Sequence, residues 1–202
     1  MIIILLGGIG SGKTLSAVKE ITDNDQYALT NFNLKNMKNY HRIKVSNILK
    51  KYTNEKDKPD FKVNWEFWEK VRKKHKNYSI YLDEIHNIIH SRRSMSKVNI
   101  LMSKWVSQIR KILSDSPNNH LYLISQTLRK IDIDFRDLAQ IFIWCRKFDI
   151  NGNIYIKQFW YDGLDMYLMN RRSATKIFKG NRYFKYYRTG EMITFSDAEQ
   201  YL

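Results

Sequence analysis

The chain has 202 residues, enough for one domain with an appendage, and its 43% hydrophobic and 27% charged residues allow a buried core. Lys and Arg number 35 against 20 Asp and Glu, a net charge of +15 that indicates a polyanionic partner, nucleic acid before a membrane surface. The single cysteine excludes an internal disulfide and indicates a reducing compartment.

The apolar start of the chain ends after Leu6, far short of the roughly 20 residues that a membrane span needs. It also lacks the positively charged first part of a signal peptide. We therefore expect a soluble, cytoplasmic protein with no stable membrane insertion.

A strand, a glycine-rich loop and a helix follow one another at the N-terminus. The run Ile2–Leu6 is typical of a strand buried on both faces of a parallel sheet. The next residues match G-x-x-x-x-G-K-[ST] and lead into a helical pattern with Leu15, Val18 and Ile21 on one face. The matching residues are Gly7, Gly8, Ile9, Gly10, Ser11, Gly12, Lys13 and Thr14.

This pattern predicts a phosphate-binding loop (P-loop) for ATP. Backbone N–H groups and the helix N-terminus attract phosphate oxygens. Lys13 would bind the β- and γ-phosphates, and the hydroxyl of Thr14 would bind Mg²⁺. Leu15, which follows directly, completes the predicted nucleotide-binding residues.

A second apolar strand, Tyr78–Leu82, ends in two carboxylates. We expect Asp83 to hold Mg²⁺ through water and Glu84 to activate the water that attacks the γ-phosphate. Alternatively, the two acids only cap a helix that begins near Ile85.

A third apolar strand, residues 121–124, is followed by Ser125 and Gln126. If it lies beside the P-loop strand, Gln126 would sense the γ-phosphate and position water; a simple turn is the alternative. His86 and His90 have the spacing of metal ligands, but no third ligand stands out, so we expect His86 to lie beside the nucleotide instead.

Two amphipathic helices are predicted between these strands. Asn64 would cap the first, which extends to about residue 76 with Trp65, Trp68 and Val71 facing inward. The second covers roughly residues 97–113.

In this order, the P-loop, the acidic pair and the Ser125-Gln126 strand end resemble the zonular occludens toxin (Zot) domain of filamentous phage assembly ATPases, over about residues 1–150. This family belongs to the FtsK/HerA branch of DNA-pumping ATPases, which includes viral genome-packaging motors. The resemblance implies an α/β P-loop NTPase fold of the ASCE, RecA-like type, with a mostly parallel central sheet flanked by helices. It gives no support to toxin activity.

The resemblance also implies ATP hydrolysis with Mg²⁺ and action as a homo-oligomeric ring on nucleic acid, most simply double-stranded DNA. It assigns Lys13 and Thr14 to phosphate and Mg²⁺, Asp83 and Glu84 to the Walker B motif, and Gln126 to the sensor. An arginine that reaches a neighbour's ATP is expected in such rings, and Arg110 and Arg136 are both candidates.

The C-terminal part, residues 151–202, is predicted to be a β-rich, basic extension of a core that covers residues 1–150. Asn151-Gly152 is a hairpin signal between strand-like runs at 141–148 and 154–161. Beyond it, basic residues alternate with aromatic ones, as in a nucleic-acid surface or a protected edge strand. The basic residues are Arg171, Arg172, Lys176, Lys179, Arg182, Lys185 and Arg188. The Lys-rich residues 35–62 are interpreted as an insertion.

Phage assembly proteins of this family carry a membrane span after the ATPase domain, and this sequence has none. We therefore expect first a viral genome-packaging motor, with capsid or portal-like vertex proteins as partners, in the host cytoplasm or on the virion. A Zot-type assembly or export ATPase and a small-molecule (nucleotide) kinase are the alternatives.

Overall fold

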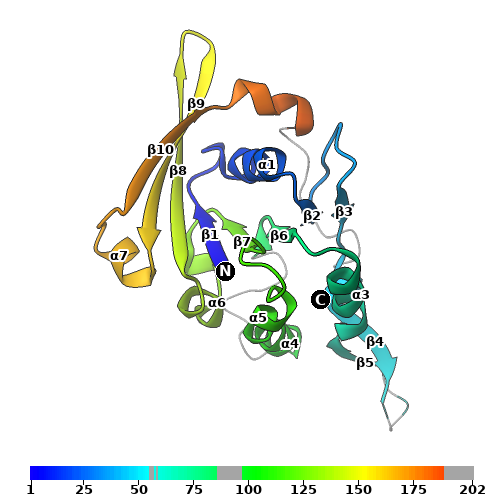
Figure 1. Ribbon diagram of the computed structural model, residues 1–202. Coiled ribbons are helices and arrows are strands. Elements are labelled where there is room, and N and C mark those ends of the chain that lie inside the picture. Colours follow the sequence, from blue (N-terminus) through cyan, green and yellow to red (C-terminus); the bar gives the residue numbers. More distant parts are fainter. Residues whose placement is uncertain (55–56, 58, 86–96, 189–202) are drawn as a thin grey trace.

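The computed structural model describes residues 1–54, 57, 59–85 and 97–188. An eight-stranded sheet forms its centre, and a two-stranded sheet of β4 (Leu49–Thr53) and β5 (Pro59–Val63) lies apart from it (Figure 1). The strands of the central sheet are β1 (Ile2–Leu6), β2 (Tyr27–Thr30), β3 (Tyr40–Arg42), β6 (Tyr78–Leu82), β7 (Leu121–Ser125), β8 (Ile141–Ile150), β9 (Asn153–Asp162) and β10 (Ala174–Lys179).

Short and medium helices connect these strands. They are α1 (Lys13–Asn24), α2 (Val45–Ile48), α3 (Trp65–Lys74), α4 (Lys97–Ser107), α5 (Ile109–Ile112), α6 (Ile133–Asp137) and α7 (Leu164–Leu168), with the 3-10 turns η3 (Leu128–Lys130) and η4 (Asn181–Tyr186). Among the described residues, no helix combines the length and the apolar character needed to cross a bilayer.

The central sheet has the strand order β10-β9-β8-β1-β7-β6-β2-β3. The pairings from β8 to β3 are parallel, and those of β9 with β8 and β10 are antiparallel. Strand β7 lies between the P-loop strand β1 and the acidic strand β6. It is therefore β7 that forms the additional strand of the predicted class. The α/β fold class, with a mostly parallel sheet, flanking helices and a β-rich C-terminal part, is confirmed.

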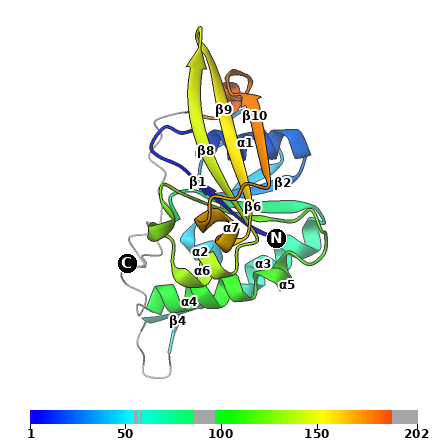
Figure 2. The same cartoon turned by 90° about the vertical axis from the view of Figure 1, so that its left-hand side faces the viewer.

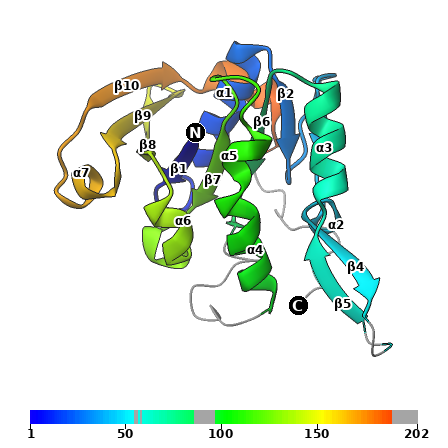
Figure 3. The ribbon, with the colours of Figure 1, turned by 60° about the horizontal axis from the view of Figure 1, so that its bottom comes forward.

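Alternate residues of β1 face the two sides of the sheet, because successive side chains of a strand point in opposite directions. Ile3 and Leu5 pack with Val18 and Ile21 of α1 on one face. On the other face, Ile4 packs in the core that α3, α4, α5 and α6 cover, and Figure 3 shows these helices in front of the sheet. Both faces of β1 are therefore buried, as its continuous apolar sequence predicts.

The predicted helix after Asn64 is present, and the Asn64 side chain accepts a hydrogen bond from Phe67 N at 3.3 Å. The prediction for Trp65 is wrong: its side chain is 39% exposed, whereas Trp68 is 1% exposed. The second predicted helix is interrupted at Gln108, so it forms α4 and α5 instead of one unit.

The Asn151-Gly152 turn joins β8 to β9 as predicted, with positive φ at both residues (51° and 76°). Strands β9 and β10 continue the central sheet through this hairpin without a break at residue 150. The hairpin projects beyond the rest of the sheet (Figure 2). Within residues 35–62, β3 joins the central sheet, whereas β4 and β5 pair only with each other.

Candidate functional site

The glycine-rich loop connects β1 to the N-terminus of α1. Gly12 precedes the helix with φ of 90°, and a Cβ placed on it would lie 2.2 Å from Cδ1 of Ile156 in β9. A side chain at position 12 would therefore strain the backbone and collide with the neighbouring strand. No side chain in the described part of the chain caps α1, so its first N–H groups face the loop without a side-chain acceptor there.

Two polar side chains of the loop are arranged for an anionic ligand. Lys13 is buried, and its Nζ donates to the carbonyl oxygen of Gly8 at 3.0 Å. The Ser11 hydroxyl is buried with no hydrogen-bond partner in the described part of the chain. A buried hydroxyl and open helix N–H groups beside a lysine fit phosphate oxygens.

Thr14, at the start of α1, contacts Asp83, which follows β6. The Thr14 hydroxyl donates a hydrogen bond to Oδ2 of Asp83, which is only 1% exposed. Burial raises the pKa of Asp83 to about 6, and the charge of Glu84 adds to this, against the opposing effects of Thr14 and Lys13. A nearby cation would favour the ionised carboxylate, so this pair of oxygens fits Mg²⁺.

The described residues contain no group of three or more His, Cys, Asp or Glu that would hold a metal by protein ligands alone. Mg²⁺ in phosphate-transfer sites takes one or two protein oxygens and completes its shell with phosphate and water. His86 and His90 lie outside the described residues.

Asn31, at the end of β2, holds the backbone of Asp83 in place. Its side-chain Nδ2 donates to the Asp83 carbonyl at 2.7 Å, and its Oδ1 accepts from Asp83 N at 2.8 Å. Glu84 follows with φ of 48°, and its N–H donates to Oδ1 of Asp83 at 2.8 Å. Two adjacent acids thus receive different orientations from a local backbone turn. No motif in the sequence had pointed to Asn31.

Gln126 lies beside Glu84. Its Nε2 donates to the two carboxylate oxygens at 3.4 and 3.5 Å, and Lys130 Nζ donates to Gln126 Oε1 at 3.1 Å. Strand β7, which Gln126 follows, pairs with both β1 and β6. The structure therefore brings the predicted sensor, base and P-loop to one end of three adjacent strands.

These residues line a cavity of about 560 Å³. Its lining also includes residues from the C-terminal part that the sequence analysis did not assign to the nucleotide. The complete lining is Ile9, Gly10, Ser11, Gly12, Lys13, Thr14, Leu15, Asp83, Glu84, Gln126, Lys147, Ile154, Ile156, Phe184 and Tyr187. The cavity is thus lined by residues from both ends of the described chain.

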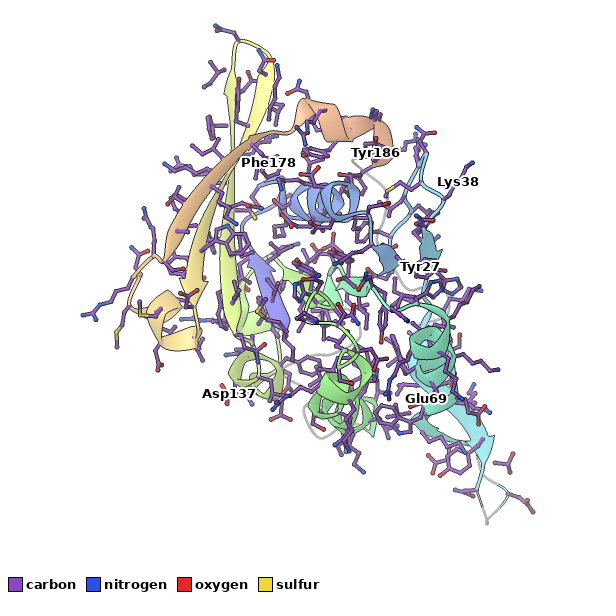
Figure 4. All side chains as sticks on the ribbon, in the orientation of Figure 1. Tyr27, Lys38, Glu69, Asp137, Phe178 and Tyr186 are labelled. Atoms are coloured by element: carbon purple, nitrogen blue, oxygen red, sulfur yellow. The ribbon has the colours of Figure 1, made fainter. Side chains whose placement is uncertain are left out.

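Residues 180–187, here called the strap, pass over α1. In Figure 4 the strap lies above α1, between the labelled Phe178 and Tyr186. Tyr183 donates its hydroxyl to both carboxylate oxygens of Asp23 at 3.0 Å, and Arg182 Nη2 donates to Oδ1 of Asp23 at 3.1 Å. The strap is therefore anchored to the last turn of α1.

A second anchor holds the other end of the strap. Lys35 N donates to the Tyr186 carbonyl at 2.8 Å, and Asn36 Nδ2 donates to the Lys185 carbonyl at 3.0 Å. The strap thus bridges α1 and the loop that follows β2.

Neither candidate arginine lines this cavity. Arg136 donates to the carbonyls of Ile131 (2.6 Å) and Arg129 (3.4 Å). Arg110 lies near the N-terminal amine, whose pKa is lowered by burial and then by the Arg110 charge. That position is at the start of β1, whereas the P-loop follows its end.

The basic residues of the C-terminal part do not form one surface. Lys176 lies over the Trp160 ring (3.9 Å), and Arg172 lies over the Phe159 ring (4.2 Å), on the opposite face of β9. Lys179 pairs with Tyr155 in the edge strand, Arg182 binds Asp23, and Arg171, Lys185 and Arg188 are exposed. The edge-strand alternative describes β10, the last strand of the sheet.

A family model described as zonular occludens toxin (Zot) matches residues 1–188, past the residue 150 at which the resemblance in motifs ends. No curated protein sequence matches the chain. Among solved structures, the N-terminal domain of zonular occludens toxin from Neisseria meningitidis is similar with a TM-score of 0.57 and 18% identity, over 93% of this chain and 98% of that one. This likeness concerns the fold.

Two further solved structures are more distant. The genome-packaging NTPase B204 of Sulfolobus turreted icosahedral virus 2, in complex with ATPγS, has a TM-score of 0.46 and 14% identity, over 87% of this chain and 95% of that one. A KaiC-like protein of Pyrococcus horikoshii has a TM-score of 0.46 and 12% identity, over 88% and 84% of the two chains.

Proposed function

The chain belongs to the Zot family of P-loop NTPases, and on this basis we propose that it hydrolyses ATP and uses the reaction in phage assembly or nucleic-acid export. The observation that carries the proposal is the contact between Thr14 of the P-loop and Asp83 at the end of β6, with Glu84 and Gln126 beside it. Phosphate-binding and water-activating groups therefore line one cavity.

Each residue has a distinct part in the proposed mechanism. Lys13 and the N–H groups at the start of α1 bind the phosphates, and Thr14 and Asp83 hold Mg²⁺. When bound, Mg²⁺ neutralises charge on the phosphate oxygens. Glu84 accepts a proton from the attacking water, and Gln126 orients that water through its contact with the same carboxylate.

The family assignment favours the Zot-type assembly or export function over the genome-packaging motor that the sequence analysis placed first. That order depended on the absence of a membrane span after the ATPase domain, and the similar Neisseria structure is itself an N-terminal domain. The absence of a membrane span among the described residues therefore does not separate the two functions. A kinase fits the family less well.

Nucleic acid, a homo-oligomeric ring and an arginine acting in trans are further parts of the proposal. The net charge of +15 supports binding to a phosphate backbone without sequence readout. Arg110 is the better candidate for action on a neighbour, because Arg136 already donates to two carbonyls of its own chain. The guanidinium of Arg110 donates no hydrogen bond to another described residue.

The test is ATP turnover with and without DNA, for the wild type and for Glu84→Gln. Loss of a general base lowers the rate by about 10²- to 10⁴-fold, whereas ATP binding should persist. Glu69→Gln, an exposed carboxylate on α3, is the matched control and should turn over normally.

Unchanged turnover in Glu84→Gln would exclude Glu84 as the base. Transfer of phosphate to a nucleoside, rather than to water, would identify a kinase instead. If DNA did not change the turnover, the proposed ATP hydrolysis would stand, but its coupling to nucleic acid would be contradicted.

A further inference from the structure

The cavity extends to both sides of the P-loop strand. Glu84 and Gln126 follow β6 and β7 on one side of β1, whereas Ile154 and Ile156 belong to β9 on the other side. From β9 to β6 the sheet has four strand spacings, roughly 19 Å. With the phosphates on the loop and the γ-phosphate toward Glu84, the rest of the nucleotide has to extend toward β9.

On the β9 side, the strap closes over an apolar wall. A Cβ on Gly180 would lie 2.8 Å from Leu15 Cδ2 and 3.5 Å from Ile154 Cγ2, so the strap begins in direct contact with this wall. The hydrogen bonds to Asp23 then hold it across α1. The wall and the strap therefore form one fixed compartment beside the P-loop.

The chemistry of this compartment suits a flat, apolar ring. Leu15 and Ile154 supply aliphatic contacts, and Phe184 lines the cavity although its side chain is 40% exposed. Asn181 is the only amide side chain of the strap, and it already binds the Ile154 N–H (2.7 Å) and the Gly152 carbonyl (3.4 Å). Stacking and shape, rather than hydrogen bonds from that amide, would select the ligand.

We propose that the strap forms the nucleobase subsite, in which the base of a nucleoside triphosphate packs between Phe184 and the wall of Leu15 and Ile154. This inference rests on the proposed function, because it concerns the other end of the same nucleotide. The subsite favours purines over pyrimidines, since a larger ring stacks better, and distinguishes ATP from GTP only weakly.

The experiment measures equilibrium binding of ATP, GTP, CTP and inorganic tripolyphosphate to the full chain by calorimetry. In Phe184→Ala, the affinity for ATP and GTP should fall roughly tenfold, as expected for the loss of one base–aromatic contact. Affinity for tripolyphosphate should not change, because it has no base. Phe184→Tyr should keep the wild-type affinities.

Two further variants keep the test decisive. Phe184→Leu retains most of the apolar volume without the ring. It should also weaken the binding of ATP but not the binding of tripolyphosphate. Tyr52→Ala removes an aromatic side chain of similar exposure (38%) on β4, outside the cavity, and should bind like the wild type.

The proposal is overturned if neither Phe184→Ala nor Phe184→Leu lowers the affinity for ATP. It is also overturned if the affinities for ATP and tripolyphosphate fall equally. A wild-type preference for CTP over ATP would also overturn it. If the wild type bound neither ATP nor tripolyphosphate, the proposed function itself would fail, which is a different result from either of these.

Discussion

Asn31 stabilises the acidic end of β6 through two hydrogen bonds to the backbone of the buried Asp83. In Asn31→Ala, a buried N–H and a buried carbonyl lose their partner, which should cost about 1–3 kcal/mol. For a chain of this size, thermal unfolding should shift downward by roughly 2–4 °C per kcal/mol. ATP turnover should fall as well, because Glu84 follows directly.

The comparison for this variant is Asn24→Ala, whose exposed side chain binds Glu20 at the end of α1 and should change neither property. Differential scanning calorimetry and an ATPase assay measure both effects. An Asn31→Ala protein with wild-type melting and turnover would show that the two hydrogen bonds do not position the acidic pair.

Some of the site was predictable at the level of single residues, and some was not. The P-loop motif, the acidic pair and Gln126 each follow an apolar strand. In a parallel sheet these strand ends lie at the same edge, so the three groups were expected to lie close together. Asn31 also follows a strand, Tyr27–Thr30, and the same reasoning would have found it. Lys147, Phe184 and Tyr187 carry no such local signal, since only the tertiary fold brings them to the cavity.

At the scale of elements, the strap depends on an ionised Asp23. Burial raises the pKa of Asp23, but hydrogen bonds from Lys19, Tyr183 and Arg182 outweigh it, so the pKa is below the ordinary value of 3.8. A carboxyl whose pKa is lowered by folding stabilises the fold at pH values above its ordinary pKa. This stabilisation is lost as the pH falls through the lowered pKa of the folded state.

We therefore expect Asp23→Asn to melt below the wild type at about pH 6, and the difference to shrink as the pH falls below the ordinary pKa of 3.8. The expected difference is small, about 2 °C, because the carboxylate is partly exposed and screened. Melting curves of both proteins over this range measure it. A difference that persisted unchanged at low pH would show that the charge of Asp23 does not hold the strap.

Local sequence patterns predicted most of the elements that surround the site. Asn64 caps α3 and Asn151-Gly152 turns the β8–β9 hairpin, because both depend on neighbours within a few residues. The break at Gln108 and the exposure of Trp65 were not predicted, since helical periodicity alone does not show where packing partners end. The contact of Ile156 with Gly12 joins residues far apart in the sequence.

At the scale of the whole molecule, the charge of +15 predicts salt-dependent binding to nucleic acid. If about four phosphates are neutralised, affinity should fall roughly a hundredfold between about 50 and 200 mM salt, because bound counterions are released. Fluorescence anisotropy with oligonucleotides of unrelated sequence measures this, and the slopes should agree among them. Affinity that does not depend on salt would contradict the expected role of the charge.

The packing of Ile156 against Gly12 has a practical consequence for dissecting the protein. A deletion of everything after residue 150 would remove β9, β10 and the strap, and with them one side of the phosphate loop and the cover of α1. The smallest fragment that retains this scaffold around the loop therefore extends at least to Tyr187.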